Sequence, residues 1–183
     1  MRCPPPEGGS VIYEFEGKLP DIGEGTYVFD DAMVMGNVTL GERVYVGSGA
    51  RVRGDYGTIT VGSRSAIEDN AVIHARPGER TEVGEHVTIG HGAILHNCTI
   101  RDGAVIGMGA IVSDYATVGE WAVVAEGAVV KNKAEIPDGH VAVGVPAKVI
   151  GEITPEYKET WTRFKDIYVD LASRRYPAGL RRA

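Results

Sequence analysis

Aliphatic residues recur at every sixth position along most of the chain, with Gly, Ala or Ser between them. The series consists of Val34, Leu40, Val46, Val52, Val61, Ile67, Ile73, Val83, Ile89, Leu95, Ile100, Ile106, Val112, Val118, Val124, Val130 and Ile136. Three extra residues interrupt it before Val61 and four before Val83, and one residue is missing before Ile100. Neither the 3.6-residue period of a helix nor the two-residue period of a strand gives this spacing. Hexapeptide periodicity is typical of a parallel β-helix, in which each short face contributes one inward aliphatic and three faces make one coil.

The repeat accounts for most of the chain and leaves no room for a second domain. We therefore expect one β-helix domain over residues 1–153, long enough to bury a continuous core. A β segment over residues 10–20 is expected to cover the first coil, because an open sheet edge invites aggregation. The predicted fold class is mainly β, a parallel β-helix followed by a C-terminal α-helix.

That α-helix is predicted over residues 154–176, where Thr154 suits the N-cap and Pro155 the first helical position. Apolar residues then follow at spacings of four, three, four and three, which predicts one apolar stripe packed against the β-helix. The stripe comprises Tyr157, Trp161, Phe164, Tyr168 and Leu171. Residues 177–183 form a basic tail, which we expect to be solvated.

Three histidines can be placed on this coil by counting. His74 and His96 each follow an inward aliphatic residue, and their separation of 22 residues becomes 18, one coil, when the four inserted residues are removed. The two side chains should stack on one corner at the β-ladder spacing of roughly 4.8 Å. Arg53 joins the same column, because it lies one coil before His74 when the earlier insertion is removed.

The third histidine, His91, falls on a different corner. It comes two residues after the inward Ile89, on a corner that it shares with Glu68. A single coil cannot bring the two corners together. They can converge if neighbouring copies pack about a threefold axis in a heterologous contact that closes into a ring. We therefore expect a site shared between subunits.

Three neutral imidazoles with an open fourth position are what a catalytic zinc ion needs. On ligand type alone, Fe²⁺ and Co²⁺ remain possible beside Zn²⁺. The alternative is that His74, His91 and His96 are separate surface histidines, since the chain contains five histidines in all.

Four segments carry a resemblance to a known family. They are VRGDYGTITVG, IEDNAVIH, IGHGAILHNCTI and GVPAKVI. Together they resemble the γ-class carbonic anhydrase family, over about residues 11–175. The resemblance implies a left-handed coil, a homotrimer with interfacial metal sites, and the reversible hydration of carbon dioxide to bicarbonate. It also implies that His74, His91 and His96 are the metal ligands.

Further residues match the family's site. Arg53 and Asp55 match a charged pair beside the metal at the subunit interface, and Asp69 matches a polar residue that supports that interface. Glu68 stands where the family usually has Gln, so a carboxylate lies next to the cation as an electrostatic helper, a proton acceptor or an extra ligand. Tyr168 lies in a YVDLA segment, and a tyrosine in a similar context reaches the family's metal pocket; the spacing alone makes it a core aromatic.

The loop after His74, ARPGERTE, is shorter than the acidic loop that shuttles protons in the best-studied members of the family. General acid–base help commonly contributes about 10²- to 10⁴-fold. Hydration is therefore expected to be slower here.

Charge and composition narrow the partners. A net charge of −6 disfavours nucleic acid as a partner. No apolar run is long enough for a membrane span, and the first residues lack the hydrophobic core of a signal peptide, so we expect a cytoplasmic location. Cys3 and Cys98 are too few for a disulfide framework, and Cys98 is expected to be a packed thiol. His86 is expected to face solvent, and His140 to be structural.

Two other function classes fit the repeats. Hexapeptide-repeat acyltransferases share the coil and the PAKVI ending, and commonly use a histidine as general base with acetyl-coenzyme A as donor. A metal-binding, thioesterase-like protein with little hydration activity is the third possibility. A fold shared by several chemistries does not choose among them.

Overall fold

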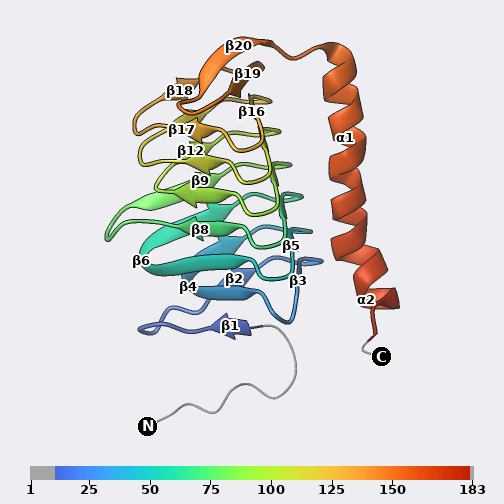
Figure 1. The fold of residues 1–183 in the computed structure, drawn as a ribbon. Helices are drawn as coiled ribbons and strands as arrows, with labels where there is room; N and C mark the ends of the chain where they lie inside the picture. The colour runs from blue at the N-terminus through green and yellow to red at the C-terminus, as the bar shows by residue number, and fades with distance from the viewer. Residues whose placement is uncertain (1–10, 182–183) are drawn as a thin grey trace.

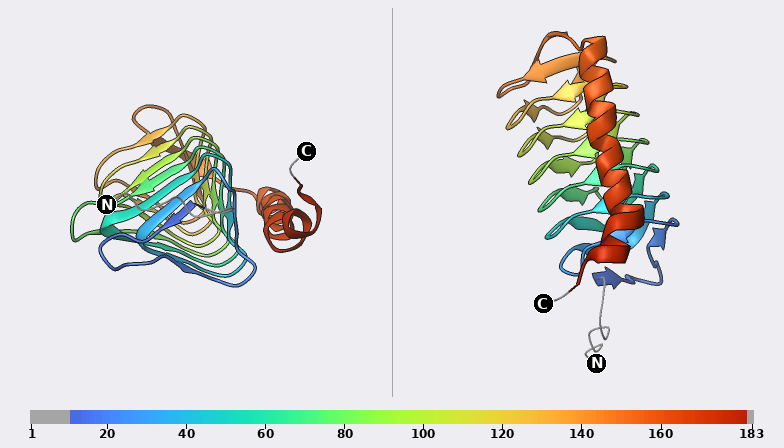
Figure 2. Two further views of the ribbon diagram at one scale, coloured as in Figure 1. Left: turned by 90° about the horizontal axis from the view of Figure 1, so that it is seen from below. Right: turned by 90° about the vertical axis from the view of Figure 1, so that its right-hand side faces the viewer.

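The computed structural model describes residues 11–181 and shows a left-handed parallel β-helix with a helical arm beside it (Figure 1). Every member of the aliphatic series is at most 4% exposed and lies in one continuous core. The hexapeptide prediction is therefore confirmed. Figure 2 shows the triangular cross-section that three faces produce, with the helical arm running along one of them.

Two faces of the triangle belong to one 12-stranded sheet, because two long strands bend around the corner between them. These are β4 (Met33–Leu40) and β6 (Arg51–Val61). On the first face they are joined by β1 (Val11–Tyr13), β8 (Val72–His74), β11 (Ile94–His96), β14 (Ile111–Val112) and β17 (Val129–Val130). On the second face they are joined by β2 (Asp21–Ile22), β9 (Arg80–Val83), β12 (Thr99–Ile100), β15 (Thr117–Val118) and β18 (Glu135–Ile136).

The third face is an eight-stranded sheet. It consists of β3 (Tyr27–Val28), β5 (Tyr45–Val46), β7 (Ala66–Ile67), β10 (Thr88–Ile89), β13 (Val105–Ile106), β16 (Val123–Val124), β19 (His140–Val143) and β20 (Lys148–Glu152). Neighbouring strands are parallel except β19 and β20, which form an antiparallel pair at the last coil. At the opposite end β1 pairs with β4 and covers the first coil, as expected of the segment after residue 10.

The helical arm begins where the sequence predicts. Thr154 caps α1 (Pro155–Asp170), and its Oγ1 accepts a hydrogen bond from the backbone N–H of Tyr157 at 3.1 Å. The arm continues through a π-helical segment, η1 (Leu171–Arg175), into α2 (Tyr176–Gly179). Its lower part packs on the third face, where Tyr168, Leu171 and Tyr176 contact a cluster that contains Tyr45, Ala66 and Ala172.

The predicted apolar stripe is wrong at one position. Phe164 is 50% exposed, whereas the next residue, Lys165, is 1% exposed and faces the β-helix. The Lys165 ammonium donates hydrogen bonds to Thr88 Oγ1 and to the Ala104 carbonyl, both at 3.1 Å. The orientation of α1 is thus set partly by a buried polar contact, which apolar spacing cannot reveal.

Two other expectations from the sequence concern His86 and Cys98. The His86 side chain is only 18% exposed and its Nε2 lies 3.3 Å from Asp166 of α1, so the expectation that it faces solvent is wrong. Cys98 is a buried free thiol, as expected, and burial raises its pKa to about 12. Cys3 and the end of the basic tail lie outside the described residues. Within residues 11–181 no helix is both long and apolar enough to cross a membrane.

Candidate functional site

Strand register builds the predicted histidine column. Arg53 of β6 pairs with His74 of β8, and His74 pairs with His96 of β11. The two imidazole rings lie 5.3 Å apart between centroids, close to the spacing of neighbouring strands. The column therefore exists as counted from the sequence, and it stands at the end of the first face.

The Arg53–Asp55 pair adjoins this column. Asp55 Oδ1 lies 2.8 Å from His74 Nε2, and Asp55 Oδ2 lies 3.2 Å from an Arg53 guanidinium nitrogen. Burial raises the pKa of Asp55, but the hydrogen bond from His74 and the charge of Arg53 hold it below its usual value. An ionised carboxylate only accepts hydrogen bonds, so Nε2 carries the proton of a neutral His74 in this arrangement.

His96 has a carboxylate partner that the sequence analysis missed. Its Nδ1 lies 2.5 Å from Oδ1 of Asp114, whose side chain is only 7% exposed. Oδ2 of Asp114 in turn accepts a hydrogen bond from Arg76 Nε at 2.7 Å. Burial raises the pKa of Asp114, but hydrogen bonds from Arg76 and His96 hold it below its usual value. Asp114 follows His96 by 18 residues, whereas one coil here spans 17 because a residue is missing before Ile100, so the count reaches Ser113 and misses Asp114 by one position.

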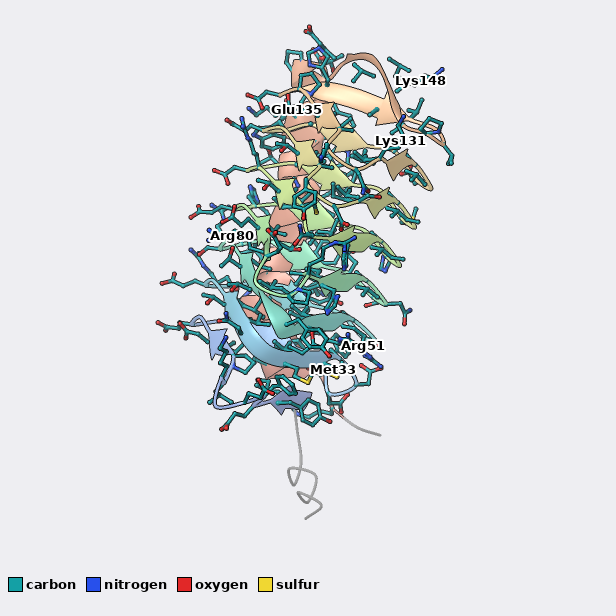
Figure 3. All side chains as sticks on the ribbon, turned by 90° about the vertical axis from the view of Figure 1, so that its left-hand side faces the viewer. Met33, Arg51, Arg80, Lys131, Glu135 and Lys148 are labelled. Atoms are coloured by element: carbon teal, nitrogen blue, oxygen red, sulfur yellow. The ribbon has the colours of Figure 1, made fainter. Side chains whose placement is uncertain are left out.

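The column opens onto a cavity of ≈ 500 Å³. Its walls come from neighbouring strands of the first face and combine basic, imidazole and apolar side chains. The lining residues are Met33, Arg51, Arg53, Val72, His74, Ile94, Leu95 and His96. Figure 3 shows Met33 and Arg51 next to each other on this side of the molecule. The cavity offers cationic donors beside apolar walls, which suits a small substrate that carries or gains negative charge.

His91 stands on another corner with Glu68 and Asp69. It follows β10, and its Nε2 lies 3.1 Å from Oε2 of Glu68 while its Nδ1 lies 3.5 Å from Oδ2 of Asp69. Glu68 is buried, and it also accepts a hydrogen bond from the backbone N–H of His91 at 3.2 Å. The His91 side chain itself is 45% exposed. Gly92 has a φ of +68°, so the turn explains this glycine of the GHG segment.

Tyr168 of α1 reaches the same corner. Its ring lies 5.0 Å from that of Tyr45, which makes it part of the aromatic cluster under the arm. Burial, followed by the charge of Glu68 and a hydrogen bond with it, raises the pKa of the Tyr168 hydroxyl. Tyr168 therefore packs as a core aromatic and also contacts Glu68, so both roles considered for it are compatible with its position.

One subunit alone does not assemble a three-ligand site. Within residues 11–181, no group of three or more His, Cys, Asp or Glu side chains is arranged to hold a metal ion. His96 fits a metal ligand, because the proton on Nδ1 leaves Nε2 unprotonated. His74 fits only if its Nε2 exchanges Asp55 for the ion or if it binds through its other nitrogen. The donor set matches zinc chemistry, provided that His91 comes from a neighbouring copy.

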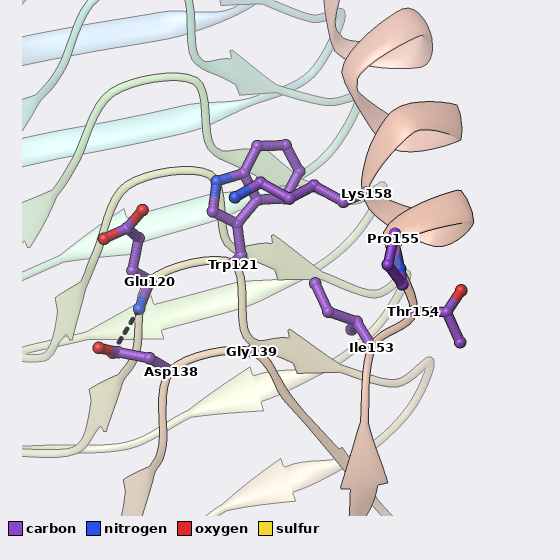
Figure 4. A pocket seen from close by; sticks show the side chains of 8 residues that line it. All are labelled: Glu120, Trp121, Asp138, Gly139, Ile153, Thr154, Pro155 and Lys158. Atoms are coloured by element: carbon purple, nitrogen blue, oxygen red, sulfur yellow. Dashed lines mark hydrogen bonds between the residues drawn. The ribbon is translucent and has the colours of Figure 1, made fainter.

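A second cavity of ≈ 480 Å³ lies where α1 begins (Figure 4). Lys158 Nζ lies 4.6 Å from the centre of the Trp121 ring, and Asp138 Oδ1 accepts a hydrogen bond from the Glu120 N–H at 2.8 Å. The Lys158 contact fastens the start of the helix to the β-helix, and the Asp138 contact joins two neighbouring coils. Because its lining contains no histidine, the cavity at the histidine column is the stronger candidate site.

Comparison with known proteins places this architecture in the hexapeptide-repeat class. A family model described as the GMPPB C-terminal domain matches residues 56–158, and one described as bacterial transferase hexapeptide (six repeats) matches residues 20–54. A hexapeptide transferase family protein from Anaplasma phagocytophilum is 30% identical, with a TM-score of 0.86, over 93% of this chain and 99% of that one. A Bacillus cereus protein described as a candidate acetyltransferase is 34% identical, with a TM-score of 0.73, over 91% of this chain and 96% of that one.

The chain therefore belongs to the hexapeptide transferase family, and to the family of the GMPPB C-terminal domain, whose model covers more than half of it. The carnitine operon protein CaiE of Escherichia coli O157:H7 is 36% identical over 74 residues, which are 40% of this chain and 38% of CaiE. The match thus spans less than half the length of these curated relatives. The fold and the family are established by these findings, whereas the metal, the reaction and the residue roles stay predictions.

Proposed function

We propose that the protein is a metal-dependent enzyme that hydrates carbon dioxide at a site shared between the subunits of a homotrimer. His74 and His96 of one subunit and His91 of its neighbour would hold Zn²⁺, Fe²⁺ or Co²⁺. The observation that carries this proposal is the stacked column in which buried Asp114 holds Nδ1 of His96. A carboxylate on the far nitrogen is the usual partner of a metal-binding imidazole.

An ion held by three imidazoles supplies Lewis acidity and activates water as a nucleophile at neutral pH. The apolar walls formed by Val72 and Ile94 favour an uncharged gas molecule. Arg53, which lies beside His74, attracts the bicarbonate that forms. On the other corner, Glu68 contacts His91 and would take up a proton.

Acyl transfer from a coenzyme A thioester is the second candidate, and the relatives support it more directly than they support hydration. The Anaplasma and Bacillus relatives carry transferase names. The pair formed by His96 and Asp114 also suits a general base that faces the cavity, because the carboxylate orients the imidazole. In this candidate His91 has no direct role.

The test is subunit complementation with metal analysis. His91→Ala and His74→Ala trimers should each lose the metal that the wild type binds at about one ion per subunit. When the two variants are unfolded and refolded together in equal amounts, about one quarter of the interfaces combine an intact His74–His96 column with an intact His91. We expect about that fraction of the metal and of carbon dioxide hydration to return.

Three other outcomes of these measurements would contradict the proposal. Metal bound by the separate variants would place the ion outside this site. No metal in the wild type, together with consumption of acetyl-coenzyme A, would replace hydration by acyl transfer. Stoichiometric metal without hydration would favour a thioesterase-like activity.

A further inference from the structure

We infer that Asp114 and Arg76 are positioning residues that fix the ring of His96 and its proton for the reaction. The inference rests on the proposed function in one respect, that His96 is a working imidazole of the site. It applies whether His96 binds an ion or accepts a proton from a substrate, because both tasks need an unprotonated Nε2.

Arg76, Asp114 and His96 form a continuous series of contacts that runs from solvent to the cavity. The Arg76 side chain is 53% exposed, and its guanidinium donates a hydrogen bond from Nε to Oδ2 of Asp114 at 2.7 Å and forms an ion pair with the same oxygen through Nη2. The other carboxylate oxygen of Asp114 lies 2.5 Å from Nδ1 of His96. Each oxygen of this buried carboxylate therefore has its own partner.

These contacts determine which ring nitrogen of His96 carries the proton and which keeps its lone pair. Because an ionised carboxylate accepts but does not donate, Nδ1 of His96 keeps its proton and Nε2 keeps its lone pair. The stacked ring of His74 has the opposite arrangement, since its Nε2 contacts Asp55. Two rings 5.3 Å apart thus present different nitrogens, and His96 is the one already prepared to bind or to accept a proton.

Arg76 has a distinct part in this arrangement. It belongs to the turn inserted after β8, where its backbone N–H also donates to Oδ1 of Asn97 at 3.4 Å. Its charge compensates the buried carboxylate and prevents Asp114 from turning away from His96. Arg76, the outermost of these three hydrogen-bonded residues, thus comes from a turn inserted into the repeat. Counting coils alone therefore does not reveal Arg76.

The experiment compares Asp114→Asn, Arg76→Gln and a control, Asp102→Asn. Asp102 also lies at a corner, where its Oδ1 accepts a hydrogen bond from the backbone N–H of Glu85 at 2.8 Å. The first measurement is ¹⁵N NMR of the histidine rings in metal-free protein, with His96 assigned through His96→Gln. The second is zinc affinity by competition with a chelator.

In the wild type and the control we expect a single His96 tautomer with the proton on Nδ1. Asp114→Asn should give a mixture of tautomers and bind zinc roughly 10- to 100-fold more weakly. Arg76→Gln should shift both measurements in the same direction by a smaller amount, and Arg76→Lys should restore part of the loss. Since the Arg76 side chain is half exposed, its variants remain informative if Asp114→Asn does not fold.

A wild-type His96 tautomer in folded Asp114→Asn or, failing that variant, in Arg76→Gln, would overturn the inference. The NMR measurement needs neither metal nor activity. If the tautomer changes while no variant binds zinc, the positioning role stands and the metal-dependent function fails. If zinc binds equally to all variants and the tautomer is unchanged, the metal site stands and the positioning role fails.

Discussion

The buried lysine under the helical arm makes stability depend on pH in a way that one substitution should remove. Lys165 is 1% exposed, and its ammonium lies 5.7 Å and 5.8 Å from the centres of the Trp121 and Trp161 rings. Burial lowers the pKa of Lys165 from 10.5 to about 7, although the charge of Glu68 opposes this change. The substitution Lys165→Met keeps a long side chain and abolishes the titration.

The direction in which stability changes with pH follows from whether the folded or the unfolded state binds the Lys165 proton. Between pH 7 and 10.5 the unfolded chain holds the Lys165 proton and the folded chain does not, so the free energy of unfolding rises with pH. Below pH 7 both states are protonated and the contribution is constant. The limiting slope is about 1.4 kcal/mol per pH unit, and the gain between pH 7 and 9 is roughly 2 kcal/mol because titration is only half complete at pH 7.

The assay is equilibrium denaturation of wild type and Lys165→Met at pH 6, 7, 8 and 9, at one protein concentration because assembly contributes to stability. The difference in unfolding free energy between the two proteins should be flat up to pH 7 and should then change by roughly 2 kcal/mol by pH 9. Lys158→Met, which removes an exposed lysine from the same helix, is the control for the loss of one positive charge. Parallel curves for wild type and Lys165→Met would show that the Lys165 ammonium does not lose its proton on folding.

Three shorter predictions concern the site. Tyr168→Phe keeps the ring against Tyr45 and loses the Glu68 contact. The free energy of unfolding should change by no more than about 1.5 kcal/mol, while turnover falls. Unchanged turnover would leave Tyr168 a core aromatic only. Glu68→Gln should slow hydration and make it depend more strongly on buffer, by roughly tenfold or more, whereas identical buffer curves would end the proton-transfer role. Arg53→Ala removes the cation beside His74 and Asp55, and should raise KM for bicarbonate more than it lowers kcat; the reverse pattern would contradict its role as an anion contact.

The coil could be predicted because its core is one-dimensional. Each inward aliphatic contacts the equivalent residue one coil away, so a fixed count in sequence becomes a fixed position in space. The same count placed Arg53, His74 and His96 in one column, and one coil further on it reaches Ser113, because the coil that lacks a residue before Ile100 spans 17 residues. Asp114 is the next residue, where the chain turns, so its contact with His96 depends on the geometry of the corner and not on the count.

The helical arm was predicted, but its rotation about its own axis was not, for a different reason. A helix docked on a flat face is not tied to the repeat, so its rotation depends on side chains from several coils at once. Lys165 finds Thr88 and the Ala104 carbonyl, and this contact turns Phe164 towards solvent. Likewise His86 is covered by Asp166 of the arm, which no count along the coil could indicate.

The two candidate functions make opposite demands on His91. Acyl transfer needs the cavity, His96 and its carboxylate, all of which belong to one corner of one subunit, so His91→Ala should leave that activity nearly intact. Metal-dependent hydration needs both corners, so loss of His91 should be as damaging as loss of His96. The structure separates these residues onto different corners of the same chain, and a comparison of His91→Ala with His96→Ala therefore tests the chemistry and the subunit arrangement at once.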